Sequence, residues 1–182
     1  RGASRPFARW IVETVTPQPE AAVARIPEHS LEEIAAKDIV VVLDGVQDPG
    51  NVGTILRLCL GFNASLLMIE SADPSSPKVV RSSAGAFFKS VWIEVKRDEA
   101  MKAIENLKRP VYRLEKTAGA LAFAAQALKE LPKQLVLIAG SEGQGIKLDI
   151  AGQSLMVPHE ETLESLNVAN TLAIVLAGLF VR

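Results

Sequence analysis

The chain has 182 residues, 48% of them hydrophobic and 23% charged, a composition typical of one globular domain with a full core. The net charge of −1 at pH 7 argues against a protein that coats nucleic acid over its whole surface, although a local basic surface remains compatible with it. Cys59 is the single cysteine, so the chain can build neither an internal disulfide nor a cysteine-based metal site.

The first 36 residues differ from the rest of the chain. Prolines at positions 17, 19 and 27 interrupt them, and they show little regular apolar pattern. We interpret residues 1–36 as a linker or as the remnant of a preceding domain, and we expect the main domain to occupy residues 37–182.

From Asp38 onward, short apolar runs alternate with helical patterns, which predicts an α/β fold with a parallel sheet and helices on both faces. The predicted strands are Ile39–Leu43, Ser65–Ile69, Ser90–Val95, Val111–Leu114, Gln134–Ala139 and Ser154–Val157. The predicted helices are Val52–Leu60, a short one over Val79–Ala86, Asp98–Leu107, Leu121–Lys129 and Leu166–Val181.

The last predicted helix, Leu166–Val181, is apolar on nearly all sides. Such a helix must be buried in a core or at a subunit interface, and we favour a homodimer contact. Its apolar run is too short to span a bilayer, so we expect no membrane association and a cytoplasmic location.

Three segments follow predicted strands and carry polar residues. The first, Leu43–Arg57, reads as a strand end, a turn and a helix on which Arg57 lies between apolar neighbours. A permanently charged guanidinium among apolar residues is expected to have a hydrogen-bonding or ionic partner, or a functional role. Asn51, after Pro49 and Gly50, could cap this helix or contact a ligand.

The second segment is the turn GSEGQG, Gly140–Gly145. Its glycines allow the backbone to approach a ligand closely, but the spacing is not that of a P-loop. A glycine-rich turn without a ligand would look the same. Glu142 could cap a following helix or fix a cation such as Arg57.

The third segment, Leu155–Asn170, leads into the last helix. Ser165 could cap that helix, which would place Asn167 in its first turn, where a buried amide demands hydrogen-bond partners. The two residues could form a local network only, or they could hold a loop or a substrate. Because the carboxyl ends of parallel strands line one crevice, we expect the three segments to meet there.

A hydrolase is a competing interpretation. Ser141 lies in a sequence similar to a nucleophile elbow, and Asp149 and His159 follow it in the order of α/β-hydrolases. Gly143 and Gly145 disfavour the helix that this elbow requires.

Taken together, the three segments resemble the SpoU (TrmH-type) RNA 2′-O-ribose methyltransferases of the SPOUT superfamily. The first motif of that family, an Asn followed six residues later by an Arg, matches Asn51 and Arg57. The second matches Gly140–Gly145, and the third, a Pro followed by Ser-Leu-Asn-Val, matches Pro158 and Ser165–Val168. Arg81–Phe88, RSSAGAFF, is similar to the family's segment between the first two motifs.

The resemblance implies a deep C-terminal trefoil knot, a homodimer with sites near the interface, and methylation of a ribose 2′-hydroxyl in RNA, with rRNA favoured over tRNA. No metal is implied. The implied cofactor is S-adenosylmethionine, held largely by backbone. The residues that the resemblance assigns to its binding are Leu114, Thr117, Ala139, Gly140, Gly143, Val157 and Leu166.

The resemblance also implies roles for five side chains. Arg57 would stabilise charge that develops on the ribose oxygen, because a guanidinium is too weak an acid to serve as a general base at neutral pH. Asn51 and Glu142 would orient Arg57, while Ser165 and Asn167 would shape the site. Residues 10–33 resemble the end of a leading RNA-binding domain.

The chain departs from the family pattern on one loop. His159 stands where Met is usual, and Glu161 stands where Gly is usual. These departures keep open a second interpretation, a catalytically silent module of the same fold that binds RNA or a nucleotide.

Overall fold

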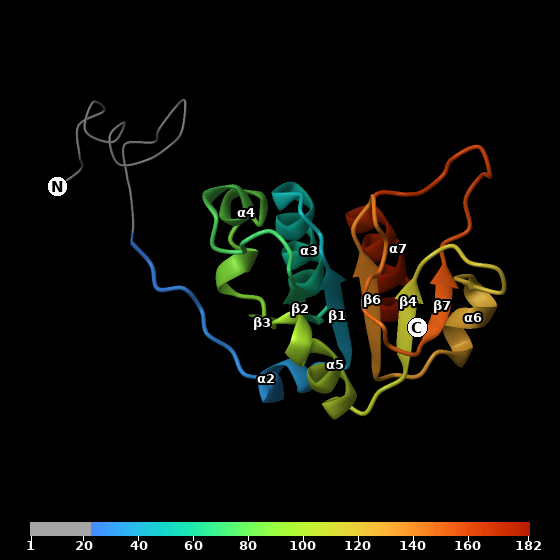
Figure 1. Cartoon of the computed structure of the whole chain (residues 1–182), viewed down its shortest axis with the longest axis horizontal. Coiled ribbons are helices and arrows are strands. Elements are labelled where there is room, and N and C mark those ends of the chain that lie inside the picture. Colours follow the sequence, from blue (N-terminus) through green and yellow to red (C-terminus); the bar gives the residue numbers. More distant parts are fainter. Residues whose placement is uncertain (1–22) are drawn as a thin grey trace.

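The computed structural model describes residues 23–182, in which a seven-stranded sheet forms the centre of the molecule (Figure 1). The strand order is β3-β2-β1-β6-β4-β7-β5, and every neighbouring pair is parallel. The strands are β1 (Ile39–Asp44), β2 (Ser65–Ile69), β3 (Trp92–Glu94), β4 (Val111–Leu114), β5 (Leu121–Ala122), β6 (Leu135–Gly140) and β7 (Gln153–Met156).

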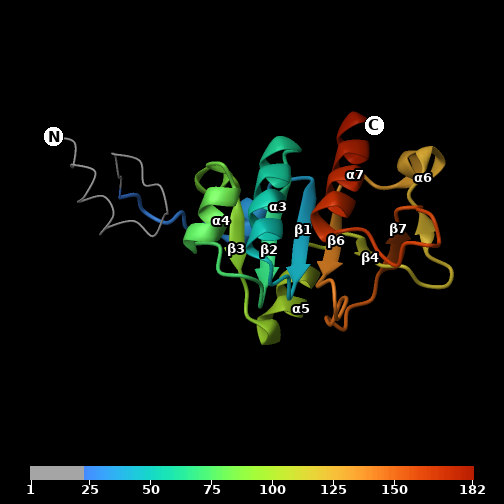
Figure 2. The same cartoon turned by 90° about the horizontal axis from the view of Figure 1, so that it is seen from above.

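Helices cover both faces of this sheet, as the alternation of strands and helices predicts (Figure 2). Helices α3, α4, α6 and α7 lie over one face, and α2 and α5 lie over the other. Their bounds are α2 (Leu31–Ala35), α3 (Pro49–Gly61), α4 (Pro77–Ser82), α5 (Arg97–Asn106), α6 (Ala125–Glu130) and α7 (Val168–Val181), with a 3₁₀ turn, η1, at Ala86–Phe88.

Alternate side chains of strand β1 contribute to two hydrophobic cores, one on each face of the sheet. Val41 and Leu43 point into the cluster beneath α3 and α7, while Val40 and Val42 point into the cluster beneath α2 and α5. All four side chains are fully buried. A strand covered on both faces reads as a continuous apolar run, which is why this one could be located from sequence.

Helix α7 lies beside α3 on the same face of the sheet. One side of it is deeply buried through Leu172, Val175 and Leu176. The other side leaves Ile174 44% exposed and Phe180 58% exposed. The chain itself therefore covers only part of this apolar helix. None of the helices among residues 23–182 combines the length and hydropathy that crossing a membrane requires.

One predicted helix is wrong in its first half. Leu121 and Ala122 form strand β5 beside β7, and the helix begins only at Ala125. The predicted helix Val79–Ala86 is also displaced, because α4 ends at Ser82 and the left-handed residues Ala84 and Gly85 lead into η1. The predicted ends of the remaining elements lie within three residues of the observed ones.

Helix α2 lies just before the expected boundary at residue 37 and packs onto the domain. Residues 31–35 form α2, which Ser30 and Glu33 cap reciprocally. Ile34 is fully buried in the core, and its carbonyl accepts a hydrogen bond from the Ser65 hydroxyl. The packed part of the chain therefore begins by about Ser30, while residues 1–22 of the expected linker lie outside the described residues.

Candidate active site

The candidate site lies where the connections leave β1 and β6 at the middle of the sheet. These strands are neighbours, and Asp44 and Gly140 are paired at their carboxyl ends. From β1 the chain continues through β2 to β3 on one side, whereas β4 and β7 lie on the other. In open parallel sheets, ligands bind at such a switch point.

Helix α3 brings Asn51 to this point. Asp48 is the N-cap, since its carboxylate accepts a hydrogen bond from the Asn51 backbone N–H at 2.7 Å, and Pro49 opens the helix. Of the two alternatives left open for Asn51, the N-cap is therefore wrong. Asn51 lies in the first turn of the helix, and this position leaves its side chain free to reach across to other segments.

The polar side chains of the three motif segments form one hydrogen-bonded triangle. The Asn51 amide donates to Glu142 Oε1 at 3.1 Å, and the Asn167 amide donates to the same oxygen at 2.9 Å. Asn167 also donates to Asn51 Oδ1 at 3.0 Å. The three residues are separated by up to 116 positions in the sequence.

Asn167 has a second task, because it caps α7. Its Oδ1 accepts from the backbone N–H groups of Ala169 at 2.9 Å and Asn170 at 3.2 Å. The expectation that Ser165 caps this helix is wrong. Ser165 lies before the cap and lines the adjacent pocket.

The turn after β6 depends on two glycines. A Cβ on Gly140 would lie 2.1 Å from the carbonyl carbon of Gly145, a separation that real atoms do not tolerate. Gly145 has a φ of +64°, in the left-handed region that glycine favours. Ser141 and Gly145 close the turn with paired backbone hydrogen bonds. This tight turn carries Glu142, and no helix follows for Glu142 to cap.

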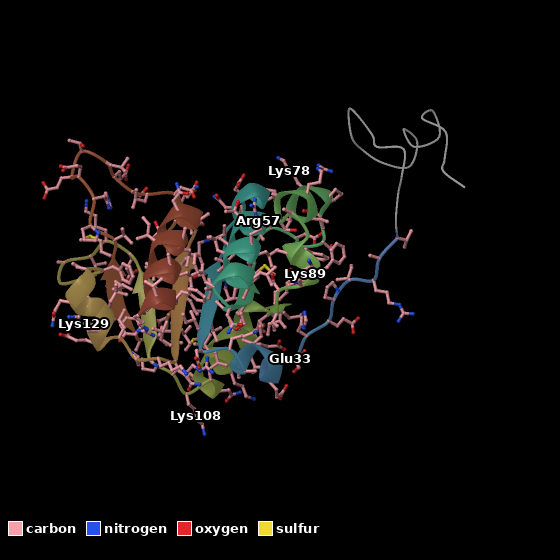
Figure 3. All side chains as sticks on the ribbon, turned by 180° about the vertical axis from the view of Figure 1, so that it is seen from behind. Glu33, Arg57, Lys78, Lys89, Lys108 and Lys129 are labelled. Carbon is pink, nitrogen blue, oxygen red and sulfur yellow. The ribbon has the colours of Figure 1, made fainter. Side chains whose placement is uncertain are left out.

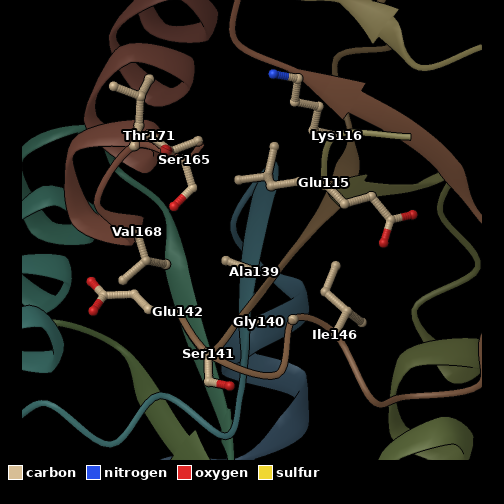
Figure 4. A pocket seen from close by; sticks show the side chains of 13 residues that line it. Glu115, Lys116, Ala139, Gly140, Ser141, Glu142, Ile146, Ser165, Val168 and Thr171 are labelled. Atoms are coloured by element: carbon tan, nitrogen blue, oxygen red, sulfur yellow. The ribbon is translucent and has the colours of Figure 1, made fainter. Parts of the chain in front are cut away.

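A pocket of about 240 Å³ opens beside the triangle, and Glu142 is one of the residues that line it. Figure 4 shows these lining residues. Residues at the ends of β4 and β6 line it opposite the start of α7. A smaller pocket of about 110 Å³ adjoins it along the end of β7, and the two share six residues. The shared residues are Leu114, Glu115, Lys116, Ser165, Leu166 and Thr171.

The pockets contain most of the residues expected to bind a cofactor. The larger one is lined by Leu114, Ala139, Gly140 and Leu166, and the smaller one by Val157. Two expected residues do not line either pocket. They are Thr117, exposed in the loop after β4, and Gly143, exposed at the tip of the turn after β6.

Sequence reasoning missed Glu115, which lines both pockets. Arg113 forms an ion pair with it at 3.0 Å, and the Ser154 hydroxyl donates to it at 2.7 Å. Burial acts to raise the pKa of Glu115, but these two partners outweigh burial and hold the pKa below its usual range. Glu115 is therefore an anion. Its position directly after the predicted strand Val111–Leu114 was the signal by which it could have been found from the sequence.

Asp44 was also missed. It is 1% exposed at the end of β1, where its carboxylate accepts hydrogen bonds from the backbone N–H groups of Lys147 at 2.6 Å and Leu148 at 2.7 Å. Arg97 forms an ion pair with it at 2.8 Å. Asp44 thus ties the segment after the Gly140–Gly145 turn to β1.

Arg57 lies apart from the triangle. Its side chain is exposed on α3 and lines neither pocket. It makes no hydrogen bond or ion pair with another residue of 23–182, so the expected pairing with Glu142 is not formed within one chain.

The hydrolase arrangement is not formed. The Ser141 hydroxyl accepts a hydrogen bond from the Gln144 backbone, and His159 Nδ1 lies 2.8 Å from the Val157 carbonyl. No hydrogen bond joins Ser141, Asp149 and His159, and no helix follows Ser141 directly. That interpretation is wrong. Within residues 23–182, His, Cys, Asp and Glu side chains form no cluster that could hold a metal ion.

Residues 38–177 match the family model described as the SpoU rRNA Methylase family. The chain belongs to this family. The match covers all three motif segments, including the residues of the triangle.

Similar proteins agree with this assignment. The chain is 35% identical over 169 residues to a 23S rRNA (guanosine(2553)-2'-O)-methyltransferase of Bacillus subtilis, covering 90% of this chain and 65% of that protein. It is also similar to an AdoMet-bound rRNA methyltransferase structure from Sinorhizobium meliloti, at a TM-score of 0.74 and 26% identity over 84% of this chain and 60% of the other.

A structure from Porphyromonas gingivalis, described as that of a putative RNA methyltransferase of the TrmH family, has a TM-score of 0.73 and 30% identity over 94% of this chain and 69% of the other. The chain thus spans about two thirds of the length of these relatives, or less.

Proposed function

We propose that this chain is the catalytic part of an RNA methyltransferase that uses S-adenosylmethionine to methylate a ribose 2′-hydroxyl, with rRNA as the substrate. The observation that carries the proposal is the triangle of Asn51, Glu142 and Asn167 beside the pocket. It joins one residue from each of the three motifs. The Bacillus subtilis relative, named as a 23S rRNA 2'-O-methyltransferase, supports rRNA over tRNA.

The pocket residues fit the cofactor. S-adenosylmethionine, when bound, supplies an electrophilic methyl group on a positively charged sulfonium. The two pockets are lined by three carboxylates, Glu115, Glu142 and Glu164, against the single ammonium of Lys116. Such a lining attracts a cationic ligand. The apolar residues Leu114, Val157 and Leu166 offer surface for a flat heterocycle.

The catalytic side chain in this proposal is Arg57. Its guanidinium would lie against the ribose oxygen and stabilise the negative charge that develops as the hydroxyl proton passes to solvent water. Asn51 and Asn167 hold the Glu142 carboxylate in one position through the triangle, and Ser165 lines the pocket edge. These residues hold the turn after β6 in a fixed position relative to the start of α7.

Arg57 and the pocket are separate within one chain, so we propose a homodimer. The exposed apolar residues of α7, Ile174 and Phe180, lie on the helix that packs beside α3, which carries Arg57. A second copy seated on this face would cover those side chains and bring Arg57 close to the partner's pocket. Sedimentation at micromolar concentration should give the mass of two chains, and a monomer that still transfers methyl groups would contradict the proposal.

We also propose that α7 is threaded through a loop of the chain as a deep trefoil knot. The buried side of α7 and the hydrogen bonds from Arg182 to the carbonyls of Leu131 and Pro132 support this arrangement. In a single-molecule pulling experiment on the chain from its two ends, a knotted chain remains shorter than its full contour length after unfolding. Full extension would contradict the knot.

Two further parts of the proposal concern the setting of the domain. Residues 1 to about 30 would connect it to a leading RNA-binding domain, and the protein would act in the cytoplasm. The first is consistent with the chain's spanning 65% of its Bacillus subtilis relative, and the second with the naming of that relative as a 23S rRNA methyltransferase.

The test of the proposal is transfer of tritiated methyl groups from S-adenosylmethionine to ribosomal RNA. Methylation of a 2′-hydroxyl removes the nucleophile for alkaline cleavage, so the label should appear in alkali-resistant dinucleotides. Label on a base would refute the reaction type. Calorimetric binding of the cofactor without any transfer would favour the silent RNA-binding module, the second candidate, which His159 and Glu161 on the cofactor loop support.

A further inference from the structure

Beside the candidate site lies a surface on which basic residues predominate. Helices α3 and α4, with η1 and the residue after it, contain four basic residues and no acidic one. These elements pack against one another. The four residues are Arg57, Lys78, Arg81 and Lys89. Because the whole chain has a net charge of −1, this local excess is not a consequence of overall composition.

The four side chains are available to a partner. All are exposed, and none makes a hydrogen bond or ion pair with another residue of 23–182. The nearest acids in the sequence make other contacts. Asp48 caps α3 through the Asn51 backbone N–H, Glu70 pairs with Arg97, and the Asp73 carboxylate accepts hydrogen bonds from Ser75. Lys78 and Arg81 are three residues apart in α4 and so share one face.

The position of α4 relative to the site is fixed by close packing. The Ser82 hydroxyl oxygen lies 3.1 Å from the carbonyl oxygen of Pro49, the first residue of α3. Gly53 allows this contact, because a Cβ there would lie 1.9 Å from Ser82 Oγ. Figure 3 shows Lys78 and Lys89 on the same side of the molecule as Arg57, while Lys108 and Lys129 lie away from them. The charged surface is therefore held rigidly beside Asn51.

We propose that Lys78, Arg81 and Lys89 form a docking surface for the phosphate backbone of the RNA strand that flanks the reacting nucleotide. Unpaired, exposed cations spaced along a rigid surface match a polyanion, and their contacts with phosphates position a strand without reading its sequence. The inference rests on the proposed function and adds the path of the substrate. Arg57 lies at the edge of the same surface, and the proposed function assigns it to the ribose oxygen.

The test is the salt dependence of RNA binding, measured by fluorescence anisotropy with a labelled stem–loop of ribosomal RNA. The variant K78Q/R81Q should weaken binding about tenfold at low salt and reduce the slope of log K against log[salt] by about 1.5, since each lost phosphate contact removes roughly 0.7–0.9. The matched control K108Q/K129Q makes the same change in net charge on exposed residues away from the surface, and it should leave the slope nearly unchanged.

A second measurement locates the contact directly. Acetylation of surface lysines, followed by mass spectrometry, should show Lys78 and Lys89 protected by bound RNA and Lys108 and Lys129 unprotected. Equal slopes for the two double variants, no change in either, or protection elsewhere would overturn the docking surface. If the wild-type chain binds the stem–loop and transfers methyl groups while K78Q/R81Q is unaffected, only this inference fails. If the wild-type chain binds no RNA, the inference and the RNA substrate both fail.

Discussion

Replacing Asn167 by alanine removes two kinds of hydrogen bond at once. Its Oδ1 caps α7 through the N–H groups of Ala169 and Asn170, and loss of such a cap costs about 1 kcal/mol. Its Nδ2 donates to the Glu142 carboxylate and to Asn51. Because Asn167 and Glu142 are exposed, we take the lower end of the range for a charged hydrogen bond, again about 1 kcal/mol.

The expected loss is therefore about 2 kcal/mol of unfolding free energy, which for a chain of this size lowers Tm by roughly 4–8 °C. Urea denaturation followed by circular dichroism measures it. Asn170→Ala is the matched control, since its exposed side chain lies in the same helical turn outside the triangle, and it should change stability by less than about 0.5 kcal/mol.

Asn167→Asp separates the two roles. Aspartate keeps the capping oxygen but loses the donor, and it places a second carboxylate beside Glu142 Oε1, where the amide nitrogen lay at 2.9 Å. Expressed as free energies, the loss of affinity for S-adenosylhomocysteine, measured by calorimetry, should exceed the loss of unfolding free energy. If Asn167→Ala is as stable as wild type, or if Asn170→Ala costs as much, the reasoning about the triangle is wrong.

Three other predictions follow from the same structure. Gly140→Ala should cost about 1–3 kcal/mol, because the new Cβ meets the backbone of Gly145, whereas Gly61→Ala, with open space around it, should not destabilise in the same urea titration. Burial raises the pKa of the Cys59 thiol to about 12, so native protein should resist labelling by a thiol reagent until it unfolds, and rapid native labelling would contradict this. Because the pKa of Glu115 is lowered, its stabilising effect should be present at pH 7 and lost as the pH falls below about 4; a cost of Glu115→Gln that stays constant from pH 7 to pH 3 would show that charge is not involved.

The central strands could be predicted from sequence because burial on both faces makes them continuous apolar runs. Strands β2 and β4 have the predicted ends, and β1 and β6 differ by one residue. Strand β5 could not be predicted, because its two residues are held by pairing with β7, and a sequence window contains no sign of that partner. Local apolar spacing at Leu121 and Ala122 then favoured a helix.

The caps show why the site was predicted only in part. Ser165 and Asn167 are both good N-cap residues, and the choice depends on Glu142, 25 residues earlier in the sequence. For α3 a signal existed, because Pro49 favours the first helical position and so identifies Asp48 as the cap. The meeting of the three segments was predicted from the rule for strand ends, but Glu142 pairs with two amides where a guanidinium was expected.

The measurement that tests the account most directly is the single-turnover rate of methyl transfer to ribosomal RNA with saturating cofactor and an Arg57→Ala chain. We predict a fall of about 100-fold or more, as expected for loss of a group that stabilises transition-state charge. Arg57→Lys should recover part of the rate, and calorimetric affinity for S-adenosylhomocysteine should stay at the wild-type value in both variants. A wild-type transfer rate in Arg57→Ala, with the cofactor bound normally, would contradict the assignment of Arg57 to the reacting ribose.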